Sequence, residues 1–129
     1  MKTIYLAGPL RDCKENECSD WRKECKDKLS GWFNLLDPMR NNYKEHEIAD
    51  RNELVSMDKK DIIDSDIVLA NTWKISVGTS MEILFAFEHH KIIIVIGEEK
   101  NLSPWTVFHA TKILPNVQEA IKYIKEKLI

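Results

Sequence analysis

Two side chains that could do chemistry stand six residues apart in the segment Ser76-Val77-Gly78-Thr79-Ser80-Met81-Glu82. An apolar strand precedes this segment and an apolar helix follows it, so the Glu82 carboxylate lies in the first turns of a helix at the carboxyl end of a strand. Open α/β sheets bind their ligands at that edge. Gly78 lets backbone N–H groups come close to a bound group, and a helix N-terminus attracts anions. We therefore interpret Glu82 as a nucleophile and Ser76 as part of an anion seat.

Both assignments have an alternative without chemistry. A glutamate near the start of a helix is ordinarily a surface acid that the helix dipole stabilises, and Ser76 by itself would be a loop hydroxyl. The Gly-Thr-x-x-Glu pattern that ends at Glu82 favours the functional interpretation.

Composition narrows the class of protein. The chain has 129 residues, which suits one domain over residues 1–129, and its net charge of −2 comes without a basic stripe. Nucleic acid polymers are therefore not expected partners. No apolar run is long enough for a signal peptide or a membrane span, so we expect a soluble, cytoplasmic protein without a membrane partner. Cys13, Cys18 and Cys25 lack paired spacing and a fourth ligand, which predicts free thiols and no metal site.

The elements that must position Glu82 alternate between strands and helices. Apolar runs predict strands at Thr3–Ala7, Phe33–Leu36, Ile67–Ala70 and Lys91–Ile96. Helices are predicted over Ser19–Gly31 with Ser19 as N-cap, over Asp50–Ile63, over Thr79–His90 and from about Asn116 onward, and the polar stretch Met39–Ala49 is predicted as a loop. This order predicts a doubly wound α/β fold, flavodoxin- or Rossmann-like, with about five parallel strands covered by helices on both faces.

Three strand ends of this fold meet at one edge of the sheet. They carry Gly8-Pro9-Leu10-Arg11, Asp37-Pro38-Met39-Arg40 and the segment from Asn71 to Glu82, with Tyr5 just below. Neither G-x-G-x-x-G nor a P-loop pattern is present, so a dinucleotide or P-loop nucleotide site is not indicated. The crevice predicts a small anionic ligand.

Three motifs, in order, resemble the nucleoside 2-deoxyribosyltransferase superfamily. They are Ile4-Tyr5-Leu6-Ala7-Gly8-Pro9, then Asp58-x-x-Asp61-Ile62-x-x-Ser65-Asp66-Ile67-Val68, then Gly78-Thr79-x-x-Glu82-Ile83. The resemblance implies that Glu82 attacks the anomeric carbon of a nucleoside and that Tyr5 holds the Glu82 carboxylate. It also implies that Asp58 lies near the sugar and the leaving base. Tyr5 could instead be strand packing, and Asp58 a solvent-facing helix residue.

The superfamily contains transferases for free nucleosides and hydrolases for nucleoside 5′-monophosphates. The transferases share an acidic residue six positions before the catalytic glutamate, and this chain has Ser76 at that position. A carboxylate beside a phosphate costs Coulomb energy, whereas a hydroxyl can donate to it. Arg11 matches the arginine that the hydrolases aim at phosphate, and Ser103 in Asn101-Leu102-Ser103-Pro104-Trp105 matches a serine that they contribute across a dimer interface. The resemblance thus implies a nucleotide substrate and at least a homodimer.

The predicted function is hydrolysis of the N-glycosidic bond of a (deoxy)nucleoside 5′-monophosphate through a covalent glycosyl-Glu82 intermediate. Such chemistry needs a nucleophile and an acid for the leaving base, and Asp58, or the base's own ring nitrogen assisted by Asp58, supplies the acid. It requires no metal or redox cofactor. The alternatives are a 2-deoxyribosyltransferase that exchanges bases and a non-catalytic nucleotide sensor.

The predicted substrate contacts come from the three strand ends and, across a dimer interface, from the Asn101–Trp105 segment. They are Gly8, Pro9, Arg11, Asp37, Arg40, Ser76, Gly78, Asn101 and Ser103. Asp37 and Arg40 are explained equally well as a turn with its ion pair and as residues that recognise the base. The helix around Leu84 is apolar nearly all round, which is consistent with a subunit interface.

Overall fold

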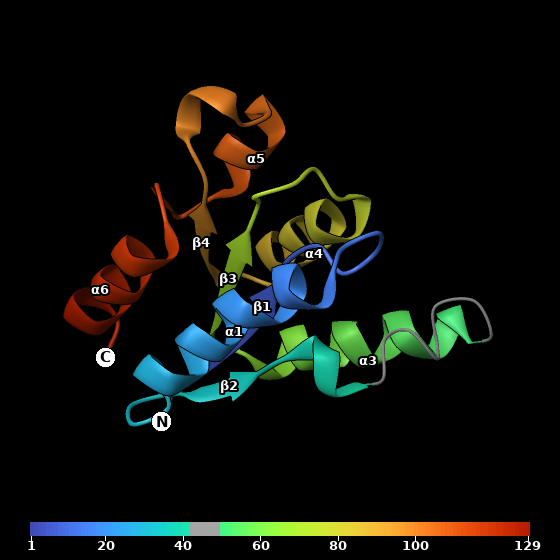
Figure 1. The fold of residues 1–129 in the computed structure, drawn as a ribbon, viewed down its shortest axis with the longest axis horizontal. Helices are drawn as coiled ribbons and strands as arrows, with labels where there is room; N and C mark the ends of the chain where they lie inside the picture. Colours follow the sequence, from blue (N-terminus) through green and yellow to red (C-terminus); the bar gives the residue numbers. More distant parts are fainter. Residues whose placement is uncertain (42–49) are drawn as a thin grey trace.

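Five strands form one parallel sheet in the computed structural model, which describes residues 1–41 and 50–129 (Figure 1). The strands are β1 (Thr3–Ala7), β2 (Asn34–Leu36), β3 (Ile67–Asn71), β4 (Ile92–Ile96) and β5 (Lys112–Leu114). Their order is β2-β1-β3-β4-β5, and every neighbouring pair is parallel. The order changes direction between β1 and β3, and a crevice opens at such a switch point. The predicted doubly wound α/β fold in a single domain is confirmed.

Helices cover both faces of the sheet. They are α1 (Glu15–Leu29), α3 (Arg51–Asp64), α4 (Val77–Glu88), α5 (Pro104–His109) and α6 (Val117–Lys127), with short 3-10 helices η1 (Pro38–Asn41) and η2 (Glu99–Asn101). Because side chains alternate along a strand, Leu6 of β1 packs in the cluster with α1 and α6. Tyr5 points the other way, into the cluster with Ile62 of α3 and Ile83 of α4. Tyr5 therefore faces the helices that carry Asp58 and Glu82.

Helix α1 begins at Glu15, four residues before the predicted cap Ser19, so that prediction is wrong. The backbone N–H of Lys14 donates to Oε1 of Glu17 at 2.8 Å, which closes the start of the helix without a serine. Ser19 lies inside the helix, where its hydroxyl donates to the carbonyl of Glu15 at 2.8 Å.

The other predicted boundaries move by small amounts. Helix α4 starts at Val77 and ends at Glu88, two residues earlier at each end than predicted, and Asp50 caps α3 by accepting from the N–H of Glu53 at 3.2 Å. Of the predicted loop Met39–Ala49, residues 39–41 belong to η1, and residues 42–49 lie outside the described part. Helix α5 and strand β5 were not located in the sequence.

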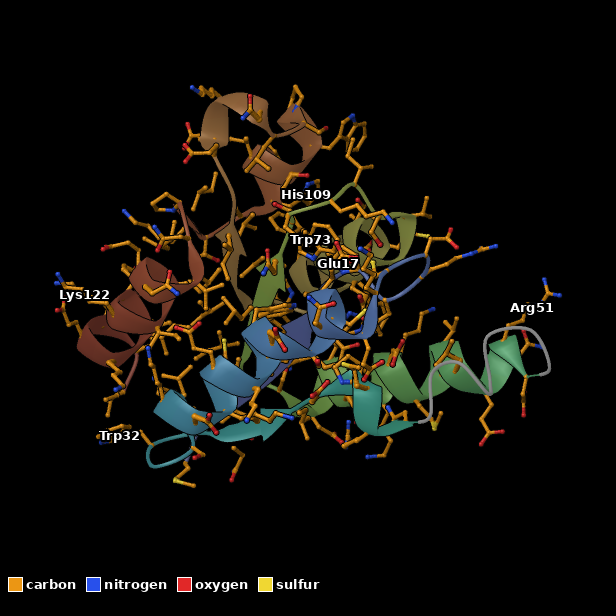
Figure 2. The ribbon with its side chains drawn as sticks, in the orientation of Figure 1. Glu17, Trp32, Arg51, Trp73, His109 and Lys122 are labelled. Atoms are coloured by element: carbon orange, nitrogen blue, oxygen red, sulfur yellow. The ribbon has the colours of Figure 1, made fainter. Side chains whose placement is uncertain are left out.

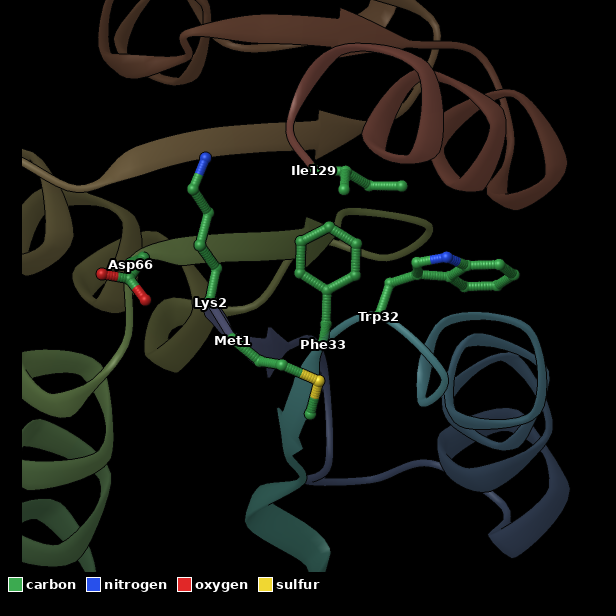
Figure 3. Close-up of a pocket in the computed structure, with 6 residues that line it drawn as sticks. All are labelled: Met1, Lys2, Trp32, Phe33, Asp66 and Ile129. Atoms are coloured by element: carbon green, nitrogen blue, oxygen red, sulfur yellow. The ribbon is translucent and has the colours of Figure 1, made fainter.

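The three cysteines form no disulfide, as predicted, and two of them, Cys18 and Cys25, are buried residues of α1. Over the described ranges, every helix is too short or too polar to cross a bilayer. A surface hollow lies at the amino ends of the strands, where Lys2 precedes β1 and Asp66 precedes β3 (Figure 3). The predicted residues around Glu82 belong to the other edge of the sheet, so this hollow is not the candidate site.

Candidate active site

Helix α4 brings Glu82 to Tyr5. Ser76 caps this helix by accepting a hydrogen bond from the N–H of Thr79 at 3.3 Å, which fixes the helix start and so the place of Glu82 two turns on. The hydroxyl of Tyr5, which is fully buried on β1, donates to Oε2 of Glu82. Two residues 77 positions apart in the chain thus form one polar pair at the switch point of the sheet.

Burial controls the protonation of this pair. It raises the pKa of Glu82 to about 8, the hydrogen bond from Tyr5 opposes that rise, the nearby Asp58 charge adds to it, and the Arg22 charge lowers it. Burial also lifts the pKa of Tyr5 well above its usual value, with the charges of Glu82 and Asp58 adding to the effect. Tyr5 therefore stays a neutral hydrogen-bond donor.

Asp58 completes a three-residue cluster with Tyr5 and Glu82. Burial, followed by the charge of Asp61, raises the pKa of Asp58 to about 6, while a hydrogen bond with Tyr5 lowers it. Its Oδ1 is buried and has no hydrogen-bond partner among the described residues, and the hydroxyl of Thr79 is in the same state. Buried polar atoms without partners are rare in folded proteins. The cluster therefore has hydrogen-bonding capacity that the chain itself does not use.

Lys74 links the two loops that carry the predicted anion contacts Arg11 and Ser76. Nζ of Lys74 donates to the carbonyl oxygen of Asp12 at 2.8 Å. Lys74 stands two residues before Ser76, and Asp12 follows Arg11 directly. The contact thus holds the β1–α1 loop beside the segment that enters α4.

The two glycines of the site have different surroundings. A Cβ at Gly8 would lie 2.7 Å from a ring carbon of Trp21 and 3.2 Å from Nη2 of Arg22, so α1 requires the glycine there. A Cβ at Gly78 would meet only the Ser76 hydroxyl, at 4.0 Å, so the chain's own packing does not require it. Like Gly8, Pro9 is buried.

Asp37 and Arg40 form a turn with ion pairs. Asp37 is buried, its Oδ1 accepts from the N–H of Met39 at 2.9 Å, and its Oδ2 accepts from Lys26 at 2.9 Å. Arg40 binds both carboxylate oxygens of Asp61, at 2.7 and 2.9 Å. This is the structural alternative that the sequence left open, and substrate contacts by Asp37 and Arg40 remain predictions.

Asn101 and Ser103 belong to a different part of the chain. Asn101 ends η2, and Ser103 caps α5 by accepting from the N–H of Trp105 at 3.1 Å. Both side chains are exposed. His109 ends α5 (Figure 2). Its ring meets that of Phe87 of α4 edge-on, with ring centroids 4.7 Å apart. Helix α5 is thus anchored on α4, and any contact of Ser103 with a substrate remains a prediction.

The sequence did not identify Arg22 as part of this site. Its side chain is fully buried, and its guanidinium donates to the carbonyls of Leu6, Gly8 and Cys18. The signal that could have found it is its position on the buried stripe of α1, between Cys18 and Cys25, where an apolar residue is expected.

Comparisons with known proteins identify the fold and the family. The sequence model of the family described as nucleoside 2-deoxyribosyltransferase matches residues 4–116. No curated protein sequence matches the chain. Among solved structures, the 2-desoxiribosyltransferase from Leishmania mexicana is 17% identical, with a TM-score of 0.77 over 100% of both chains.

Two further structures share the fold. The 2-deoxyribosyltransferase from Bacillus psychrosaccharolyticus is 16% identical, with a TM-score of 0.74 over 94% of this chain and 91% of the other. The CMP N-glycosidase of Clostridium botulinum is 15% identical, with a TM-score of 0.68 over 98% of this chain and 100% of the other. At such identities the structures establish the fold, and the family match covers most of the chain. This protein therefore belongs to the nucleoside 2-deoxyribosyltransferase family.

Proposed function

We propose that the protein hydrolyses the N-glycosidic bond of a (deoxy)nucleoside 5′-monophosphate and releases the free base and (deoxy)ribose 5-phosphate. The observation that carries the proposal is the buried cluster of Tyr5, Asp58 and Glu82 at the switch point of the sheet. It offers a carboxylate held by a hydroxyl and a second carboxyl group of raised pKa, which are the two groups that glycosidic cleavage needs.

The reaction proceeds in two displacements. An ionised Glu82 oxygen attacks the anomeric carbon, the bond from that carbon to the base nitrogen breaks, and its electron pair leaves with the base. Asp58, or a ring nitrogen of the base assisted by Asp58, protonates the leaving base. Water then adds to the glycosyl ester, which frees Glu82 and yields the sugar phosphate. Tyr5 orients the Glu82 carboxylate throughout, because its hydroxyl already donates to Oε2.

The 5′-phosphate is assigned to the start of α4. Ser76 caps this helix, the N-terminus of a helix favours an anion, and the space beside Gly78 is open. The link from Lys74 to Asp12 keeps the loop of Arg11 beside this helix. The transferases carry an acid at the position of Ser76. The Ser76 hydroxyl and the Arg11 guanidinium suit a phosphate better than a carboxylate does, because both can donate hydrogen bonds to it.

The named relatives support an enzyme that acts on N-glycosyl bonds and leave two reactions to be separated. One structure is named a CMP N-glycosidase and two are named deoxyribosyltransferases. The second candidate for this chain is therefore exchange of bases on 2′-deoxynucleosides. It predicts little benefit from a 5′-phosphate and little loss of activity in Arg11→Ala.

The proposal includes a homodimer in which the partner subunit supplies a second Ser103. In its own chain Ser103 is an exposed cap of α5, with no contact to Glu82 recorded in the described part. Helix α5 and the outer side of α4 expose large apolar side chains, among them Met81, Phe87, Trp105 and Phe108. The rings of Phe87 and Phe108 lie beside each other, with centroids 5.9 Å apart, and exposed apolar side chains that gather in this way are typical of an interface.

Chromatography of released base separates the candidates. The protein is incubated with ribo- and deoxyribonucleosides and their 5′-monophosphates, with and without a second base, beside Glu82→Ala. We expect free base from monophosphates alone and none with Glu82→Ala. Exchange products from unphosphorylated deoxynucleosides would establish the transferase, and nucleotide binding that Glu82→Ala preserves, without any base release, would establish a sensor.

A further inference from the structure

Arg22 is a fully buried cation whose hydrogen bonds go to the main chain. Nε and Nη2 each donate to the carbonyl of Leu6 at 3.3 Å, Nη2 also donates to the carbonyl of Gly8 at 3.1 Å, and Nη1 donates to the carbonyl of Cys18 at 2.7 Å. The guanidinium thus joins α1 to the carboxyl end of β1 and to the loop that follows it.

The acid nearest to Arg22 is shared with another cation. Nε of Arg22 lies 3.6 Å from Oδ1 of Asp37, whose other oxygen accepts from Lys26 at 2.9 Å. A buried charge is costly unless it is paired, so a single shared acid is weak compensation. Burial lowers the pKa of Arg22, and the charge of Glu82 in the site, next after that of Asp37, opposes this fall.

The loop is fitted around this guanidinium. A Cβ at Gly8 would lie 3.2 Å from Nη2 of Arg22 and 2.7 Å from Trp21, which packs its ring beside the guanidinium at 4.7 Å from the ring centroid. A larger residue at position 8 would therefore push the loop away from the Arg22 guanidinium and lengthen the hydrogen bond to the Gly8 carbonyl. Gly8 and Arg22 act as one unit that sets where the β1–α1 loop begins.

We propose that Arg22 is a positioning residue of the active site. Its hydrogen bonds fix the end of β1, and the fixed strand holds the Tyr5 hydroxyl and the loop of Arg11 in place opposite Glu82. Its fixed positive charge also favours the ionised form of the carboxyl groups in the site. The inference rests on the proposed function, since it assigns Arg22 a part in the reaction of Glu82.

The two parts of this role predict different effects. Three groups act on the pKa of Glu82 besides burial. The hydrogen bond from Tyr5 of β1 lowers it, the charge of Asp58 of α3 raises it, and the charge of Arg22 of α1 lowers it. Removing the charge raises the pH at which Glu82 ionises. Keeping the charge but losing the planar guanidinium leaves that pH near its original value. It disturbs the geometry, because one ammonium nitrogen cannot stand where Nε, Nη1 and Nη2 stand to reach the three carbonyls.

Arg22→Gln and Arg22→Lys separate these parts, with Lys26→Met as the matched control. Lys26 lies one turn later on α1 and pairs with the same Asp37, but it bonds no carbonyl of β1. Two quantities are measured: the pH dependence of kcat and KM for the hydrolysed monophosphate, and the titration of Glu82 by carbon NMR of labelled carboxyl groups, with Glu82→Gln identifying its signal.

We expect Glu82 to titrate at a higher pH in Arg22→Gln, with the alkaline limb of the rate profile, which follows the higher of the two pKa values, moving in the same direction. In Arg22→Lys we expect kcat to fall by about tenfold or more, with KM changed less and the titration close to wild type. Lys26→Met should match wild type in both measurements.

Equal Glu82 titrations in Arg22→Gln and wild type would overturn the electrostatic part. Full kcat in Arg22→Lys would overturn the clamp. If neither variant shows a cooperative thermal transition, Arg22 serves folding alone and the proposal fails. If wild type hydrolyses no monophosphate, the proposed function fails, and the NMR titration still tests Arg22.

Discussion

At the residue scale, the proposed reaction uses two carboxyl groups of raised pKa, one as nucleophile and one as proton donor. Burial raises the pKa of Glu82 to about 8 and that of Asp58 to about 6. In the proposed reaction, attack needs Glu82 ionised and proton donation needs Asp58 protonated, which is a minor combination of protonation states. The rate therefore rises with pH up to about 6, the lower pKa, and falls above about 8, the higher pKa. We expect a bell-shaped profile of kcat/KM for the monophosphate with its maximum between these values, measured by released base.

Asp58→Asn checks this assignment. The variant has no proton to lose, so the alkaline limb should disappear. The limb that remains should report the ionisation of Glu82 alone, at a pH below about 8, because the Asp58 charge that raises the pKa of Glu82 is gone. An alkaline limb that survives in Asp58→Asn would assign that ionisation to another group, such as the base.

At the element scale, the end of β4 is packed against the segment that leads to α4. A Cβ at Gly97 would lie 2.7 Å from the hydroxyl of Thr72, which is itself held by donating to the carbonyl of Ile96 at 2.7 Å. Gly97→Ala should therefore lower the free energy of unfolding by about 1–3 kcal/mol through overpacking. Urea denaturation measures the change.

Gly31→Ala is the control for that prediction. A Cβ at Gly31 would have nothing within 4 Å, so its effect should stay within about 0.5 kcal/mol. Equal losses in the two variants would mean that glycine flexibility, rather than crowding at Thr72, sets the stability.

The sequence located the elements whose pattern is local. Strand β3 is a continuous apolar run and was predicted to within one residue, whereas β5 has three residues and shows no period that a sequence could reveal. Family motifs identified Tyr5 and Glu82. Arg22 and Lys74 escaped because their partners are main-chain carbonyls of segments distant in sequence, which no side-chain pattern marks.

At the scale of the whole molecule, helix α4 has more apolar surface than one chain covers. Ile83 and Ala86 pack on the sheet, but Met81 is 65% exposed, and Trp105 of the neighbouring α5 is 76% exposed. If a second copy of the chain covered these side chains with its own, the two α5 helices and the two active sites would lie near one interface. We therefore predict a dimer in which Ser103 of each subunit lies at the active site of the other.

Mixing two inactive variants tests that assembly. Glu82→Ala removes the nucleophile, and Ser103→Gly removes the hydroxyl while weakening the α5 cap by only a few tenths of a kcal/mol. If Ser103 acts across the interface, a mixed dimer contains one intact site, with Glu82 from one chain and Ser103 from the other. Random pairing of equal amounts puts about half of the molecules in mixed dimers, so about a quarter of wild-type activity should return after the chains are refolded together. Action within one chain restores nothing, and full activity of Ser103→Gly alone would remove the serine from the site.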